Sequence, residues 1–307
     1  MTELLLQRTA GLSAYELVGA EGAPVVLAIG GISATRHVVS GTHDTTPGWW
    51  DDIVGDGRAI DTTSVRVLGV DFIDGGRARD GRPASIVTTH DQAAQIVAVL
   101  DELEIDQLDA VVGASYGGMV ALALAERWPE RVRRVIVVSA AHEPHPMSVG
   151  LRAVQRRVVQ LGIDTGRVAE GMALGRAIAM TTYRTAAEFS ERFDVEPTVG
   201  ERSAEFEVER YLMQSGDKFA SRMRAERFLA LSLSVDLHHV VPEEVRVPTT
   251  IIAAEGDTLA PPSQLEAMCA RLPHLDGYHL LPTLYGHDAF LTEPERLGQL
   301  LSRALAD

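Results

Sequence analysis

Residues 110–117 read Ala-Val-Val-Gly-Ala-Ser-Tyr-Gly, and this stretch decides how the rest of the chain is interpreted. Its apolar start is typical of a short strand that is buried on both faces of a sheet. A Gly-x-Ser-x-Gly turn centred on Ser115 follows, and then a helical pattern from Met119 to Trp128 that Pro129 ends. Glycines on both sides of the serine allow the strand and the helix to approach closely. The order of strand, tight turn and helix therefore predicts a turn that presents the Ser115 hydroxyl as a nucleophile.

Outward from this turn, short β-branched runs alternate with helical patterns. The predicted strands are residues 25–29, 65–70, 110–112, 135–138, 250–254 and 278–281. Thr89 and Gln92 have the spacing of a capping box, which opens a helix with apolar positions Ile96, Val97, Leu100 and Leu103. A last helix is expected from Pro294 to Leu305. This alternation predicts an α/β fold with a mostly parallel sheet and helices on both of its faces.

The pattern changes after about residue 145. From His145 to about Ser234 the sequence reads as helices without a clear strand. The predicted helices are residues 154–161, 168–180, 186–193 and 208–213. A helical segment placed between strands of one sheet predicts an insertion that covers the site. We therefore expect a core of residues 1–145 and 235–307, and a helical lid of residues 146–234.

A serine hydroxyl is a weak nucleophile until a base takes its proton. In the α/β-hydrolase fold, which the strand order and the serine turn predict, the acid and the histidine follow the serine in that order, each after a strand. Asp257 follows the strand at 250–254, and His287 follows the strand at 278–281. Asp288 is the rival acid, but a neighbour in sequence does not readily reach the Nδ1 atom of the histidine. We predict Ser115 as nucleophile, His287 as base and Asp257 as the orienting acid.

The negative charge that develops during attack on a carbonyl needs two backbone N–H donors. Tyr116, directly after the nucleophile, is expected to supply the first. The second is expected from the loop after strand 25–29, either from Ile32 or from Gly31. Gly30 and Gly31 could also form a plain tight turn, but their place at the carboxyl end of a strand favours the catalytic interpretation.

The formal net charge of −15 argues against nucleic acid and against an anionic membrane as partners. It does not exclude a small anionic substrate, because a local group of arginines outweighs the global field at short range. No apolar run is long enough for a membrane helix, and the first residues do not resemble a signal peptide.

Cysteine and histidine usage adds two expectations. A single cysteine, Cys269, excludes an intrachain disulfide, fits a cytoplasmic location and is expected to be a buried, inert thiol in a helix. His238 and His239 have no accompanying ligand cluster, so we predict surface or lid residues there and no metal site.

Several further segments together resemble the homoserine O-acyltransferases of the MetX type, which belong to the α/β hydrolases. The segments are 48–50, 54–57, 60–62, 115–119, Arg176 with 182–184, 211–212, 216–219 and 286–291. The Thr-Tyr-Arg and Gly-His-Asp-Ala-Phe-Leu segments are far more specific than the serine turn, and the resemblance spans residues 28–291. It implies a ping-pong reaction of methionine biosynthesis, without a cofactor. Ser115 takes an acyl group from the co-substrate acyl-CoA, and the hydroxyl of L-homoserine accepts it.

The resemblance also implies roles for individual residues and a homodimer formed through the lid helices. Arg176 would hold the homoserine carboxylate, a pairing that suits the planar guanidinium. Tyr183 would add a hydroxyl contact, and Asp288 would bind the amino group. The loop at 30–37 departs from the acetyl-using members and resembles the succinyl-using branch. Arg36 in that loop is either the partner of the free succinyl carboxylate or a solvated arginine.

Three alternatives remain open at this stage. The acceptor could be serine or another β-hydroxy amino acid, because one methylene discriminates weakly. An esterase or thioesterase would use the same triad, with water in place of the amino acid. A non-catalytic ligand receptor is the third alternative, although such a receptor has no need to retain Ser115, Asp257 and His287 together.

Overall fold

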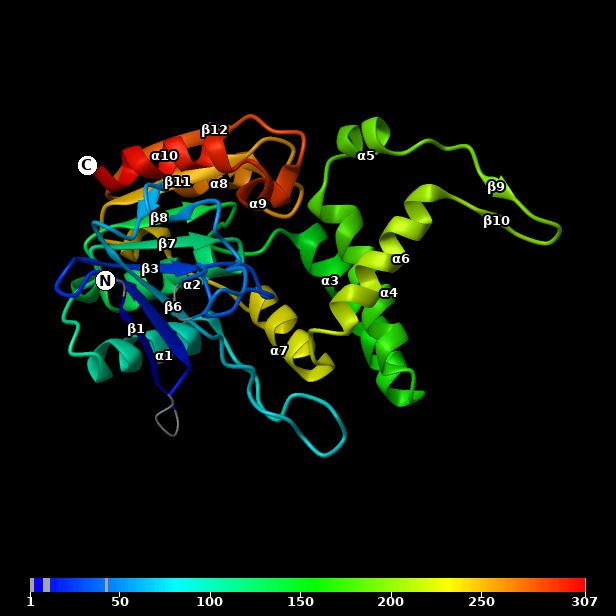
Figure 1. The fold of residues 1–307 in the computed structure, drawn as a ribbon, viewed down its shortest axis with the longest axis horizontal. Coiled ribbons are helices and arrows are strands. Elements are labelled where there is room, and N and C mark those ends of the chain that lie inside the picture. The colour runs from blue at the N-terminus through cyan, green and yellow to red at the C-terminus, as the bar shows by residue number, and fades with distance from the viewer. Residues whose placement is uncertain (1–2, 8–11, 42–43, 307) are drawn as a thin grey trace.

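An eight-stranded sheet forms the core of the computed structural model, which describes residues 3–7, 12–41 and 44–306 (Figure 1). The strand order is β1-β2-β6-β3-β7-β8-β11-β12. The strands are β1 Glu3–Gln7, β2 Tyr15–Gly19, β3 Val25–Ile29, β6 Arg66–Val70, β7 Ala110–Ala114, β8 Val135–Val138, β11 Thr249–Ala254 and β12 Leu275–Leu281. The six strands from β6 to β12 in this order are parallel, whereas β1 and β2 form an antiparallel edge. The prediction of a mostly parallel α/β sheet is confirmed.

Helices and a long connection cover the two faces of the sheet. Side chains of Leu27 and Ile29 in β3 pack in a cluster with α1 (Thr89–Glu102), α2 (Tyr116–Arg127) and α8 (Pro262–Cys269). The alternate residues Val26 and Ala28 pack with α10 (Pro294–Ala306) and with apolar residues between positions 38 and 60. Successive side chains of a strand point to opposite faces, so burial on both faces explains the continuous apolar runs of the sequence. The long connection between β3 and β6, which supplies these apolar residues, also contains the short parallel strand pair β4 (Val54–Gly55) and β5 (Ile60–Asp61).

The capping box of α1 lies one residue earlier than predicted. Thr88 is the N-cap, its side chain accepts the Asp91 N–H, and the Asp91 carboxylate accepts the Thr88 N–H at 2.8 Å. Gln92 is engaged elsewhere, because its amide forms hydrogen bonds of 2.9 and 2.8 Å with the backbone of Ile73. The prediction of Thr89 and Gln92 as the box is therefore wrong by one position.

The helical insertion stands beside the core (Figure 1). Its helices are α3 Pro146–Asp164, α4 Val168–Tyr183, α5 Ala186–Arg192, α6 Glu207–Ala220 and α7 Ala225–Asp236. Close contacts need glycine: a Cβ on Gly162 of α3 would lie 2.9 Å from the Cα of Gly171 in α4, and one on Gly216 of α6 would lie 2.4 Å from the Ala173 carbonyl oxygen. The insertion also contains a strand pair that we did not predict, β9 (Thr198–Val199) with β10 (Ala204–Glu205). Strands of two residues carry no readable alternation of apolar and polar positions.

Three residues interpreted from the sequence, His238, His239 and Cys269, have different outcomes. His238 is buried, not at the surface; its Nδ1 atom lies 2.8 Å from the Thr89 hydroxyl, and burial lowers its pKa to about 3. His239 is exposed, as predicted. Cys269 is a free, buried thiol at the end of α8, and burial raises its pKa to about 11, which keeps it protonated and unreactive.

None of the helices in the described ranges has both the length and the apolar character to cross a bilayer.

Candidate active site

Ser115 lies at the tip of a strained turn between β7 and α2. Its φ angle of 53° is in the left-handed region that residues other than glycine rarely adopt. The backbone is crowded on both sides: a Cβ on Gly113 would lie 2.4 Å from the carbonyl oxygen of Gly117, and one on Gly117 would lie 2.2 Å from that of Ile29. Both glycines of the Gly-x-Ser-x-Gly pattern are therefore required by close backbone contacts.

The structure brings Ser115, His287 and Asp257 into one hydrogen-bonded chain. The Ser115 Oγ atom lies 2.7 Å from His287 Nε2, and His287 Nδ1 lies 2.8 Å from Asp257 Oδ2. The other oxygen of Asp257 accepts the backbone N–H groups of Leu259 at 2.8 Å and Ala260 at 3.0 Å. The Asp257 carboxylate is thus held on two sides, and it orients the imidazole so that Nε2 faces the hydroxyl.

The electrostatic surroundings of His287 favour its protonated form. Burial by itself lowers the pKa of His287, whereas the charge and hydrogen bond of Asp257 raise it, and the charge of Asp288 raises it further. The net pKa lies above the ordinary 6.5, although the charge of Arg152 opposes the shift. A base of this kind readily takes a proton from the serine and stabilises the imidazolium that results.

The backbone groups predicted for an oxyanion hole lie beside the nucleophile. Gly31, Ile32 and Tyr116 all line the same cavity as Ser115. The Gly117 N–H donates to the Gly30 carbonyl at 2.8 Å, which ties the serine turn to the loop after β3. No hydrogen bond within the described chain uses the N–H of Tyr116 or of Ile32. These two donors are available for a negatively charged oxygen on a carbonyl carbon attacked by Ser115.

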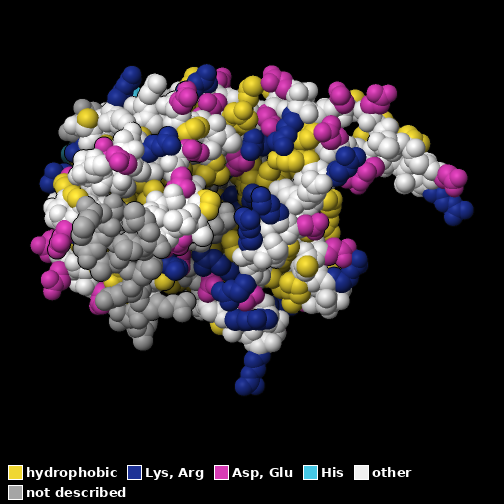
Figure 2. Space-filling view, viewed as in Figure 1, with side chains coloured by type: hydrophobic (Ala, Val, Ile, Leu, Met, Phe, Trp, Pro, Cys, Tyr) yellow, Lys and Arg dark blue, Asp and Glu magenta, His cyan; other side chains and the backbone are white. Residues whose placement is uncertain are grey.

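The cavity lies between the core and the insertion. Core loops contribute Ser115 and His287, and the insertion contributes Arg152, Arg176 and Tyr183. Figure 2 shows the hollow between the two parts, with apolar side chains inside and Lys and Arg side chains gathered beside it. Two arginines, Arg152 and Arg176, and one aspartate, Asp288, line this cavity in a protein whose net charge is −15.

Arg176 of α4 has no acidic partner among the described residues. Its guanidinium carbon lies 4.9 Å from the ring centroid of Tyr183 and 5.1 Å from that of Phe219. The Tyr183 ring in turn lies 6.1 Å from the ring of His287. A guanidinium supported on two aromatic rings keeps its N–H donors free, so it is suited to bind a carboxylate close to the triad.

Asp288 has the opposite charge and lies in the same cavity. One of its oxygens, Oδ2, accepts a hydrogen bond from Arg184 Nε at 2.9 Å. Its other oxygen has no hydrogen-bond partner within the described part of the chain. The cavity therefore contains the guanidinium of Arg176, which has no acidic partner among the described residues, and the carboxylate of Asp288, which has one oxygen free. These two charges are opposite to the carboxylate and the ammonium group of an amino acid.

Arg36 lies outside this cavity and, unlike Asp257 behind His287, has no contact with a residue of the triad. Its backbone N–H and its Nη1 atom bind the two oxygens of Asp71 at 2.8 and 2.7 Å, and its Nε atom lies 3.5 Å from Glu16. Arg36 is not among the residues that line the cavity. The geometry corrects the interpretation of Arg36 as a substrate-binding group, because its charge is already balanced by two carboxylates.

Sequence reasoning missed Arg152 and Gln155, which line the cavity from α3. Our predicted helix began at residue 154, whereas α3 begins at Pro146, so the two side chains were not recognised as neighbours on one helical face. Their spacing of three residues was the available signal.

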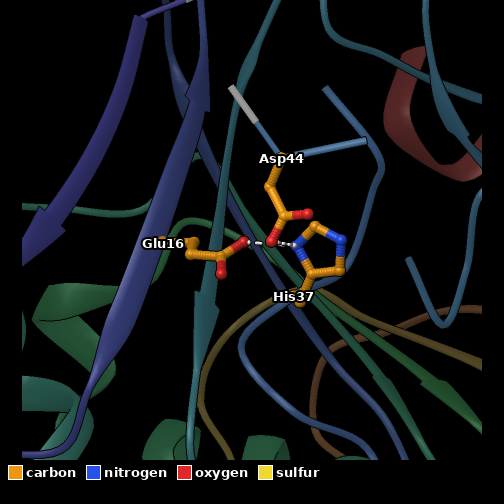
Figure 3. Close-up of side chains that lie close together, drawn as sticks. All are labelled: Glu16, His37 and Asp44. Atoms are coloured by element: carbon orange, nitrogen blue, oxygen red, sulfur yellow. Dashed lines mark hydrogen bonds and ion pairs between the residues drawn. The ribbon is translucent and has the colours of Figure 1, made fainter. Parts of the chain in front are cut away.

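Among the described residues, only Glu16, His37 and Asp44 lie close enough together to be considered as metal ligands (Figure 3). His37 Nδ1 lies 2.8 Å from a Glu16 oxygen, and Nε2 lies 2.8 Å from the Thr46 carbonyl oxygen. Both ring nitrogens face oxygen acceptors, which favours the doubly protonated ring, in which neither nitrogen offers a lone pair to a metal. Burial lowers the pKa of His37, but the hydrogen bonds to Thr46 and Glu16 outweigh burial and raise it. The cluster is an ion pair that stabilises the loop after β3.

The fold and the serine site define an enzyme of the α/β-hydrolase class, and the family model described as "alpha/beta hydrolase fold" matches residues 24–294. The chain is 42% identical to a homoserine O-succinyltransferase of Xanthomonas campestris pv. campestris, over 95% of this chain and 78% of that protein. It is 32% identical to a homoserine O-acetyltransferase of Geobacter metallireducens, over 95% and 90% of the two chains. The chain therefore belongs to the homoserine O-acyltransferase family.

A solved structure supports the fold assignment. The crystal structure of homoserine O-acetyltransferase from Bacillus anthracis superposes with a TM-score of 0.86 and covers 100% of this chain and 98% of that chain. Its sequence identity is 18%, so this likeness concerns the fold alone.

Proposed function

We propose that this protein is an acyl-CoA-dependent O-acyltransferase that makes O-succinyl-L-homoserine, with acetyl as the less favoured acyl group. The observation that carries the proposal is one cavity that holds the Ser115–His287 pair together with the unpaired Arg176 and the half-occupied Asp288. A nucleophile alone fits any acyl transfer, whereas two opposite charges at its side fit an amino-acid acceptor.

In the first half-reaction Ser115 attacks the thioester carbonyl of acyl-CoA. His287 Nε2 takes the hydroxyl proton as the oxygen–carbon bond forms. The N–H groups of Tyr116 and Ile32 stabilise the negative oxygen of the tetrahedral intermediate. When the intermediate collapses, the carbon–sulfur bond breaks and the CoA sulfur leaves with the proton from His287. The products are the acyl ester of Ser115 and free CoA.

In the second half-reaction L-homoserine enters the same cavity. Its carboxylate pairs with Arg176, the Tyr183 hydroxyl adds a contact, and its ammonium group pairs with Asp288. His287 takes the proton of the homoserine hydroxyl, whose oxygen attacks the acyl carbon. The bond to Ser115 then breaks, and the serine recovers its proton from His287. Holding both charged groups of the α-carbon orients the side-chain hydroxyl for attack and favours it over water.

Two alternative activities share this geometry. Serine carries the same ammonium and carboxylate groups as homoserine, so Arg176 and Asp288 would bind it as well. A hydrolase would resolve the acyl ester with water and would have no use for these charged groups. The proposal of homoserine transfer is supported over hydrolysis by the pair of opposite charges in the cavity.

Two further parts of the proposal concern the cell and the assembly. We infer a cytoplasmic location from the single cysteine. We also infer a homodimer formed through the insertion, which is supported by exposed apolar side chains on its helices, such as Met147, Val154 and Leu161. Light scattering coupled to size-exclusion chromatography tests the dimer, and a monomeric mass at micromolar concentration would contradict it.

The decisive experiment crosses two donors, acetyl-CoA and succinyl-CoA, with homoserine, serine and water as acceptors. CoA release gives the rate, and mass spectrometry identifies the product. We expect the highest kcat/KM with succinyl-CoA and homoserine. Preferred release of free acid would instead identify a hydrolase, O-acyl-serine would identify the other acceptor, and a preference for acetyl-CoA would overturn the donor assignment.

A further inference from the structure

Arg152 of α3 has a guanidinium group that is only partly satisfied. Its Nε atom pairs with Asp236 Oδ1 at 2.6 Å, but its buried Nη2 atom has no hydrogen-bond partner in the described chain. Arg156, one turn away, forms an ion pair of 2.6 Å with the other oxygen of Asp236, without hydrogen-bond geometry, and donates to the Ser232 hydroxyl at 3.0 Å. One carboxylate thus serves two guanidinium groups, and one positive charge remains unbalanced. Buried donors without an acceptor are rare in native proteins, so this nitrogen calls for a ligand.

The position of Arg152 relates it to the reacting groups. The side chain is 13% exposed and lines the same cavity as Ser115 and His287. Burial and the charge of Asp257 act most strongly on the pKa of His287, but the charge of Arg152 also reaches it and lowers it. Gln155, which is three residues further along α3, is buried and lines the cavity too. Its side-chain amide forms no hydrogen bond with the residues that the structure describes.

The cavity therefore contains two guanidinium groups that need an acceptor. Arg176 lies on α4 over Tyr183 and Phe219, whereas Arg152 lies on α3 beside Asp236. A homoserine molecule has one carboxylate and can satisfy one of the two. The other is left for an anion that enters the cavity with the acyl group itself.

We propose that Arg152 binds the distal carboxylate of a dicarboxylic acyl group, with the Gln155 amide as a second donor, and that this pair selects the acyl donor. The inference rests on the proposed acyl-Ser115 chemistry and names the group that distinguishes a succinyl from a neutral acyl chain. It assigns to α3 the role that the sequence suggested for Arg36. A carboxylate in this position would also balance the charge that Asp236 leaves uncompensated.

The test compares succinyl-CoA with butyryl-CoA, whose acyl chain has the same number of carbons but ends in a methyl group. For the wild-type protein we expect a kcat/KM ratio that favours succinyl. Arg152→Met should reduce this ratio at least tenfold, equivalent to about 1.4 kcal/mol. Arg152→Lys keeps a cation for Asp236 but loses the second nitrogen, and it should reduce the ratio in the same direction. Gln155→Leu should have a smaller effect of the same sign.

Two control variants separate this role from general effects. Arg157→Met removes an exposed arginine of the same helix, and Arg36→Met removes the arginine of the loop; both should leave the ratio unchanged. Butyryl transfer measured on each preparation reports whether the variant is folded. If Arg152→Met does not fold, Arg152→Lys takes its place in the test.

Three outcomes would overturn the inference: an undiminished succinyl preference in both Arg152 variants, a collapse of the ratio in Arg36→Met, or a wild-type enzyme that uses butyryl as well as succinyl. A wild-type protein that transfers no acyl group to an amino acid would instead overturn the proposed function.

Discussion

Arg184 donates through Nε to Asp288 Oδ2 at 2.9 Å, so the carboxylate that follows the histidine in the chain lies in the cavity with one oxygen already bound. The same guanidinium lies 3.5 Å from Glu188 and 5.2 Å from the ring centroid of Tyr285. Asp288 is therefore fixed in place. It can bind an ammonium group with its second oxygen, and it is not free to replace Asp257 as the orienting acid.

The first prediction concerns the triad. Ser115→Ala should abolish both the release of CoA and the acyl adduct on the protein, because it removes the hydroxyl that lies 2.7 Å from His287 Nε2. Asp257→Asn should lower kcat about 10⁴-fold, because the amide no longer holds the imidazole in the required tautomer. Stopped-flow CoA release and intact-protein mass spectrometry measure the two effects. Nearly full activity in Asp257→Asn would show that the acid is assigned wrongly.

The second prediction separates the two half-reactions. Arg176→Ala should lower kcat/KM for homoserine about ten- to a hundredfold, because a charged hydrogen bond is worth about 1.5–3 kcal/mol. Acylation of Ser115 by acyl-CoA alone involves no amino acid and should change much less. Arg167→Ala, at the exposed start of α4, is the matched control. An equal loss in both half-reactions would contradict an acceptor role for Arg176.

The third prediction is a pair of opposite shifts in pH dependence. His287 must be neutral to accept a proton, and its raised pKa places the acidic limb of the acylation rate above pH 6.5. Asp288→Asn removes a negative charge that raises this pKa, so the limb should move to lower pH. Arg152→Met removes a positive charge that lowers it, so the limb should move to higher pH.

Both shifts of the acidic limb are measured from the burst of CoA that acetyl-CoA releases without an acceptor, across a pH series at constant ionic strength. Arg157→Met, which removes an exposed charge from the same helix as Arg152, should leave the limb in place. Shifts of the same sign in the Asp288 and Arg152 variants would contradict the electrostatic assignment.

The fourth prediction concerns the ion pair of His37 and Glu16. The pKa of His37 is raised above its unfolded value of 6.5, so the folded state binds the proton more tightly. The stability from this pair is fully present below pH 6.5 and is lost as the pH rises through the folded pKa. The difference in unfolding free energy between wild type and His37→Gln should therefore shrink as the pH rises from below 6.5 through the raised pKa of His37. Urea unfolding at several pH values measures it, and a constant difference would argue against the pair.

The sequence was informative wherever a pattern is local. The runs at 25–29 and 135–138 predicted β3 and β8 because strands buried on both faces read as continuous apolar segments. Ser115, Asp257 and His287 could be assigned because their order along the chain follows from the order of strands in the sheet. The choice between Arg36 and Arg152 could not be made in this way. It depends on which carboxylates surround each guanidinium. Asp71 is 35 residues from Arg36 in the sequence and Asp236 is 84 residues from Arg152, so no local pattern reveals these pairs.

The end of α4 is fastened to the core by the Thr185 hydroxyl, which donates to the Leu284 carbonyl at 2.5 Å, and by the Thr258 hydroxyl, which donates to the Thr182 carbonyl at 3.2 Å. These anchors belong to the loops that carry His287 and Asp257, whereas Arg152 lies on a different helix. The end of the helix that carries Arg176 is thus tied to the two loops that carry the base and the acid, whereas the groups proposed to choose the acyl chain lie on α3, across the same cavity. An engineer who wished to alter acyl preference could vary a few positions of α3 without replacing a residue of the triad. The same separation gives natural variation a route to new acyl groups without rebuilding the chemistry.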